Sequence, residues 1–136
     1  MKKSRIVILS VLLGLIAAIL VACGASGPAG VSNLALYKDK AGTDKVSTFA
    51  PTDTIYLAAD VNQVASGTSF EVKWFALNVD GQDPSTPFYT SKFTYNSGNN
   101  LYAQIDSTTG GFPTGQYKVE VDMNGTNVGE QTFDIQ

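Results

Sequence analysis

The sequence has no histidine and only one cysteine among its 136 residues. Without histidine, neither a Ser-His-Asp triad nor a Cys-His pair can form, and zinc sites of the Cys/His type are excluded. A single cysteine cannot close a disulfide within one chain, so a folded domain must depend on its apolar core. These absences disfavour catalysis by an activated serine or thiol.

Basic residues are also few, and three of the nine, Lys2, Lys3 and Arg5, stand at the very start. An apolar stretch interrupted by one serine and one glycine follows, from Ile6 to Ala22. A basic start, an apolar stretch and small residues before a cleavage point form the pattern of a secretory signal. We therefore expect residues 1–22 to be a signal peptide that is removed on export.

The apolar stretch ends in Leu20-Val21-Ala22-Cys23. This tetrapeptide resembles the lipobox of bacterial lipoproteins, with a branched residue three positions before the cysteine and a small residue directly before it. The resemblance implies that the Cys23 thiol takes a diacylglyceryl group and that the new amine is acylated after cleavage. Two or more fatty chains anchor a protein stably. We therefore expect an exported protein, lipid-anchored through Cys23 to the cell membrane or outer membrane, with its domain outside the cytoplasm.

Two alternatives stay open for this segment. In the first, Cys23 is an ordinary small residue after a signal, or a buried thiol. In the second, the apolar run is an uncleaved transmembrane anchor, although its 17 residues are slightly fewer than the ~20 that span a bilayer.

Loss of the signal changes the charge balance of the chain. Six basic residues remain against twelve acidic ones, a net charge of about −6. Such a surface disfavours nucleic acid, whose phosphates need lysine and arginine, and electrostatic docking on anionic lipid headgroups. We expect no nucleic-acid partner, and membrane attachment through the lipid alone. No phosphate-binding loop precedes a helix, so we expect no cofactor.

The mature chain divides into a tether and one domain. Residues 23–32 carry the cysteine and the small, flexible sequence GASGPAGVS, typical of a linker. Residues 33–136 are strand-like throughout. Alternation is clearest from Tyr117 to Met123, where apolar and charged residues take turns, and period-two alternation indicates half-buried antiparallel strands. Asn124-Gly125 then gives a hairpin signal.

About seven such short strands, separated by turn residues, predict a sandwich or barrel. Thr114-Gly115-Gln116-Tyr117-Lys118-Val119 resembles the start of strand F in immunoglobulin-like domains, and Trp74 lies in the middle of an earlier strand. The resemblance spans 33–136 and implies an all-β, immunoglobulin-like antiparallel β-sandwich without a disulfide. It makes Tyr117 a tyrosine corner and places Val61 and Val119 where antibodies carry their cysteines. The structural core is then expected to include Trp74, Tyr117, Val61 and Val119.

The acidic residues give little indication of catalysis or of metal binding. Glu120 and Asp122 are two apart on one predicted strand, so they share its solvent face, which favours a charged surface over acid–base catalysis. Asp80-Gly81-Gln82-Asp83 lacks the ligand spacing of a calcium loop and favours a turn. We therefore expect no catalytic residue and no metal site.

Phe75, Leu77 and Val79 form the candidate binding surface, because their parity is opposite to that of Trp74. An exposed apolar cluster indicates an interaction surface. Two alternatives stay open: a β-bulge that returns these residues to the core, or cover by the segment around Phe88 and Tyr89.

These features predict a membrane-anchored, non-catalytic module that binds a protein or a glycan of the cell envelope. A structural accessory subunit or spacer of an envelope complex is the alternative. An envelope hydrolase is disfavoured by the missing histidine.

Overall fold

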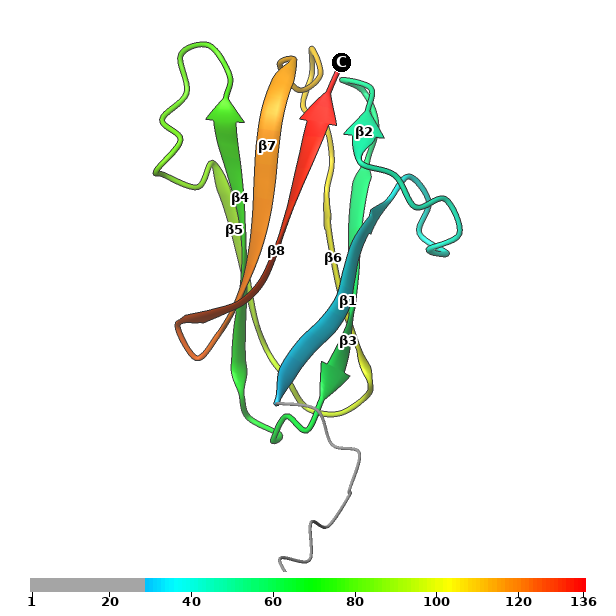
Figure 1. The fold of residues 1–136 in the computed structure, drawn as a ribbon, viewed down its shortest axis with the longest axis vertical. Helices are drawn as coiled ribbons and strands as arrows, with labels where there is room; N and C mark the ends of the chain where they lie inside the picture. Colours follow the sequence, from blue (N-terminus) through cyan, green and yellow to red (C-terminus); the bar gives the residue numbers. More distant parts are fainter. Residues whose placement is uncertain (1–28) are drawn as a thin grey trace, which may run out of the picture.

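A computed structural model describes residues 29–136, which form eight β-strands and no helix (Figure 1). The predicted signal peptide, Cys23 and most of the tether lie outside the described residues. Within the described part, no helix is long and apolar enough to cross a membrane. The all-β prediction is confirmed. The strands are β1 (Gly30–Tyr37), β2 (Thr48–Phe49), β3 (Ile55–Asn62), β4 (Ser69–Asn78), β5 (Tyr89–Thr94), β6 (Asn100–Ile105), β7 (Gly115–Met123) and β8 (Thr126–Ile135).

Two details differ from the sequence-based expectation. The strand count is eight rather than about seven because β2, which has only two residues, is too short to leave a period-two pattern. The first strand begins at Gly30 rather than after Ser32, because Val31 already packs on the core. Residues 30–32 therefore belong to the folded domain and not to the tether.

The strands form two sheets. One has three strands in the order β1-β3-β6, and the other has five in the order β2-β8-β7-β4-β5. Neighbouring strands are antiparallel, except that β2 runs parallel to β8. This exception corrects the purely antiparallel expectation. It arises because the chain changes sheets between β1 and β2 while continuing toward the same end of the molecule (Figure 1).

The core fills the space between the sheets. In β3 every second residue is buried, as alternation along a strand requires when one face meets the core. Trp74, Tyr117, Val61 and Val119 are 0, 2, 6 and 0% exposed, so the structure places all four expected core residues inside. Trp74 packs edge-on against Phe133, with ring centroids 6.0 Å apart.

The two ends of the sandwich carry different segments of the chain. The chain enters at Gly30 at one end (Figure 1). The opposite end, here called the distal end, carries the β4–β5 loop (79–88), the β6–β7 loop (106–114) and the C-terminus. The distal loops are the segments that position the candidate site.

Candidate functional site

A cleft of about 470 Å³ opens between the two sheets at the distal end. Its deepest residues are apolar and largely buried, whereas its rim is made of exposed polar side chains. This layout, an apolar base with a few polar groups around it, is typical of ligand-binding sites. The cleft is lined by Ala76, Gln82, Phe88, Tyr89, Gln104, Ile105, Asp106, Thr108, Gly111, Phe112, Pro113 and Tyr117.

Local hydrogen bonds hold the β4–β5 loop in place. The Asp83 carboxylate accepts hydrogen bonds from the backbone N–H of Ser85 at 2.9 Å and from the Ser85 and Thr86 hydroxyls at 2.6 and 2.8 Å. These bonds, the Ser85 hydroxyl first, lower the pKa of Asp83 below its ordinary value. The turn around Asp83 is therefore fixed, as its Asp, Ser and Pro residues favour, and it supports Gln82 at the cleft rim.

The β6–β7 loop is fastened to the core. The ring of Phe112 is 9% exposed and belongs to the core cluster. Its backbone N–H donates to the carbonyl of Pro51 at 2.8 Å. The Tyr117 hydroxyl donates to the carbonyl of Pro113 at 2.7 Å, and burial raises the pKa of Tyr117, which keeps the phenol neutral. This part of the cleft is thus tied to β7 and to the loop between β2 and β3.

Two adjacent aromatic residues form another part of the cleft lining. Phe88 is 41% exposed and Tyr89 is 48% exposed. The Phe88 N–H donates to the carbonyl of Trp74 at 2.9 Å, and this bond holds the pair at the point where β5 begins. Exposed rings on a fixed backbone provide contact area at small entropic cost.

Asp106 is the charged residue of the cleft lining. It follows directly after β6, so it comes from the three-stranded sheet, whereas Phe88 and Tyr89 precede and begin a strand of the five-stranded sheet. Its Oδ1 accepts a hydrogen bond from the Thr54 hydroxyl at 2.9 Å, and the Gln104 amide contacts both oxygens at 3.3–3.4 Å. Both partners are neutral, so the negative charge of Asp106 is not balanced by an ion pair within residues 29–136.

The lining groups can stack, donate and accept hydrogen bonds, and attract positive charge. Across the described chain, no group of three or more acidic, histidine or cysteine side chains is placed to hold a metal ion. The chemistry that this arrangement supports directly is binding.

The expected binding surface is not exposed. Phe75 and Val79 are each 8% exposed and Leu77 is half-buried. Lys118 lies over the Phe75 ring, with its ammonium nitrogen 5.0 Å from the ring centroid. The Phe75, Leu77 and Val79 set therefore does not form an apolar patch on the surface.

A β-bulge accounts for Val79. The register between β4 and β7 shifts between Ala76 and Asn78, so Leu77 is the extra residue and Val79 returns to the core side. Gly115 faces this bulge at a φ of +147°. A methyl group on Gly115 would lie 2.2 Å from the Asn78 carbonyl oxygen and 2.8 Å from a Val79 methyl carbon. Close backbone approach at the bulge therefore requires glycine.

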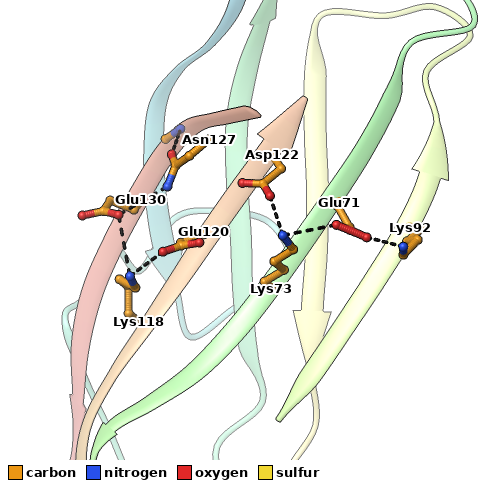
Figure 2. Close-up of polar contacts among 9 residues, drawn as sticks. Glu71, Lys73, Lys92, Lys118, Glu120, Asp122, Asn127 and Glu130 are labelled. Atoms are coloured by element: carbon orange, nitrogen blue, oxygen red, sulfur yellow. Dashed lines mark hydrogen bonds and ion pairs between the residues drawn. The ribbon is translucent and has the colours of Figure 1, made fainter. Parts of the chain in front are cut away.

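The outer face of the five-stranded sheet carries a network of ion pairs (Figure 2). Lys73 lies 2.6 Å from Asp122 and 3.3 Å from Glu71, and Glu71 also pairs with Lys92. Beside them, Lys118 pairs with Glu120 and, at 3.8 Å, with Glu130. Glu120 and Asp122 are thus partners of lysines. Each of these carboxylates lies within ion-pair distance of a lysine, so the charges on this face are paired with one another.

A second hollow, of about 530 Å³, lies along the outer face of the three-stranded sheet and the adjoining edge of β5. Tyr102, which is 66% exposed, and the half-buried Tyr56 line it, together with Lys40, Lys92 and Asp39. Its charges are of both signs, whereas the distal cleft is lined by one charged residue.

Sequence reasoning did not identify Phe88, Tyr89, Gln104 and Asp106 as site residues. The signal available was the Phe88-Tyr89 pair itself, because two adjacent residues of a run predicted as a strand point to opposite faces, so that both rings are not expected in one core. Gln104 and Asp106 gave no signal, since polar residues at a strand end are ordinary.

No known protein family matches this chain, and no curated protein sequence matches it. Among solved structures, an alkylpurine DNA glycosylase from Pseudomonas fluorescens, bound to DNA with an abasic site analog, is 13% identical, with a TM-score of 0.46 over 77% of this chain and 31% of its own. A β-glucosidase from Kluyveromyces marxianus is 20% identical, with a TM-score of 0.42 over 81% of this chain and 15% of its own. This chain spans less than a third of either structure. Likenesses this weak carry no argument about function.

Proposed function

We propose that the chain is a lipid-anchored, exported binding module whose immunoglobulin-like domain captures a ligand in the distal cleft without catalysis. The observation that carries this proposal is the position of the cleft. It opens at the end opposite Gly30, and it exposes Phe88 and Tyr89 there. Exposed rings beside a formed cavity favour binding over a purely structural role.

The strand arrangement supports the immunoglobulin-like assignment. Two packed, mainly antiparallel sheets are the general plan of that architecture, and this chain has three and five strands in them. The bond from the Tyr117 hydroxyl to Pro113, four residues upstream, has the form of a tyrosine corner. Trp74 on β4 is fully buried, as the core tryptophan of that architecture is.

The orientation follows from the proposed anchor. Cys23 precedes Gly30 by seven residues, which span at most about 25 Å when fully extended. A lipid on Cys23 would therefore hold the Gly30 end near the bilayer and direct the distal cleft away from it. The acidic mature chain has no strong electrostatic attraction to anionic lipid heads, so the lipid supplies the attachment.

The proposal is tested by site-specific photocrosslinking of the full chain in its native envelope. A photoreactive residue at Tyr89 is expected to give a discrete adduct, because the ring borders the cleft. The same probe at Thr132, an exposed residue on β8, is the matched control and should give none. If Tyr89 and Thr132 gave the same adducts, or neither gave any, the cleft would not be a binding site, and the spacer function would be favoured.

A further inference from the structure

The charge around the distal cleft is of one sign. The two loops that border it, 79–88 and 106–114, contain Asp80, Asp83 and Asp106 and no basic residue. The domain has six lysines and no arginine, and none of the six lines the cleft. A ligand with a phosphate or carboxylate would therefore meet repulsion and no matching cation.

Four of these lysines are already paired with carboxylates elsewhere. Three of them, Lys73, Lys92 and Lys118, belong to the ion-pair network on the five-stranded sheet (Figure 2). Lys38 lies 3.2 Å from Asp53. Asp106 has only neutral partners. Within residues 29–136 the Asp106 carboxylate of the cleft therefore has no cationic partner, whereas each carboxylate of that ion-pair network lies beside a lysine.

The walls of the cleft suit a cation in a second way. Aromatic ring faces attract ammonium and guanidinium groups, and arginine and lysine are the usual protein cations in such contacts. Phe88 and Tyr89 supply exposed rings from one sheet, and Asp106 supplies a carboxylate from the other. Rings and a carboxylate, the two kinds of group that attract a cation, therefore line the same cleft.

We propose that the distal cleft binds a lysine or arginine side chain of a partner polypeptide. This inference rests on the proposed function and names the ligand class. The apolar base of Ala76, Ile105 and Phe112 fits the methylene stem of a long basic side chain. Gln82 and Gln104 on the rim can donate to and accept from the backbone of the segment that carries it. A small free cation would leave the apolar base unfilled.

The test is an amide-shift titration of the full chain in detergent micelles with two synthetic peptides. The first has one lysine centred between leucine and glycine residues, and the second has glutamine in place of lysine. The lysine peptide is expected to shift the amide signals of Gln104, Asp106 and Gly111 and to bind more weakly as salt is raised. The glutamine peptide is expected to bind about three- to fivefold more weakly, because an exposed ion pair is worth up to ~1 kcal/mol, which corresponds to about fivefold in affinity.

Two variants separate the role of Asp106 from a general effect of charge. Asp106→Asn should weaken the lysine peptide about three- to fivefold and leave the glutamine peptide unchanged. Asp80→Asn removes the same charge from an exposed residue that does not line the cleft, so it should have little effect. Equal losses in the two variants would mean nonspecific attraction and would overturn the proposal.

Each remaining outcome also decides the proposal. If both peptides, or a neutral disaccharide, shifted the cleft signals with equal affinity and Asp106→Asn had no effect, the cation assignment would be wrong. If no probe shifted them, the assignment would fail as well. The proposed function is judged separately by the Tyr89 crosslink, so an adduct at Tyr89 without lysine selectivity leaves the binding module intact and removes only the ligand class.

Discussion

The ring of Phe88 packs edge-on against the ring of Tyr117, with 5.9 Å between centroids and 82° between planes. Tyr117 in turn stacks on Phe133 at 5.5 Å in the core. The wall of the distal cleft is therefore an extension of the aromatic core. This continuity fixes Phe88 on one side while its other surface stays exposed, so the cleft is formed before any ligand arrives.

The contact with Tyr117 predicts a difference between the two wall residues. Phe88→Ala should lower the free energy of unfolding by about 1 kcal/mol, within the range for an aromatic pair. Tyr89→Ala should change it by less than about 0.5 kcal/mol, as for an ordinary surface position. Denaturant melts of the two variants beside wild type measure this. Equal losses in both would contradict the idea that, of these two rings, only Phe88 is packed on the core.

Trp74 is the largest fully buried side chain. Trp74→Ala should cost about 3–5 kcal/mol, because truncating a buried aromatic removes transfer energy and leaves a cavity. Small domains have only about 5–15 kcal/mol of stability in total, so a large unfolded fraction is expected. Tyr102→Ala, at a 66% exposed position, is the control and should melt close to wild type. A Trp74→Ala melt like wild type would show that the core is packed differently.

Gly115→Ala tests the bulge that buries Val79. The added methyl would overlap the Asn78 carbonyl oxygen and the Val79 side chain, and forcing extra volume into a packed site costs about 1–3 kcal/mol. Gly81→Ala is the matched control, since it also has positive φ but nothing within 4 Å of the added carbon. The melts should show a larger loss for Gly115→Ala than for Gly81→Ala. The reverse order would mean that β4 and β7 can separate without penalty.

Acid should destabilise the domain through carboxylates that are hydrogen-bonded in the fold. The backbone N–H of Asp44, followed by the groups of Thr43, lowers the pKa of Asp39. A group whose pKa is lower in the folded state stabilises the fold above its unfolded pKa. That contribution is lost as pH falls through the folded value, below about 4.

Asp39→Asn removes one of these titrations. The variant should be less stable than wild type at neutral pH, and its stability should fall less steeply on acidification. Urea melts at a series of pH values for the two proteins measure both effects. An identical pH dependence would show that the Asp39 loop does not contribute to acid sensitivity.

The lipid anchor remains a prediction from the sequence. Cys23→Ser should give an uncleaved or mislocalised protein, because a hydroxyl cannot replace the thiol in thioether formation. Metabolic labelling with a fatty-acid analogue, followed by membrane fractionation, measures the effect. Wild type should carry the label and the variant should not. Equal labelling of both would rule out the anchor at Cys23.

The amino-acid sequence by itself determined the all-β class and the core residues. Alternation along 117–123 places Val119 and Val121 on one face and Lys118 and Glu120 on the other, and a strand's period of two leaves no other arrangement. The apolar neighbours of Trp74 at two-residue spacing put it inside in the same way. Which side chains of a strand face the core depends on residues close in the sequence, so a local pattern is enough to predict it.

Only the tertiary structure determines whether Phe75, Leu77 and Val79 are buried and where the cleft lies. Parity along β4 fails at Leu77 because a bulge depends on the partner strand, and Gly115 lies 38 residues further along the chain. Lys118, on that same partner strand, covers Phe75. Phe88 and Asp106 line one cleft only because the two sheets to which their strands belong pack together. The bulge, the cover over Phe75 and the cleft all depend on contacts between segments far apart in the sequence. The periodicity within one segment therefore cannot predict them.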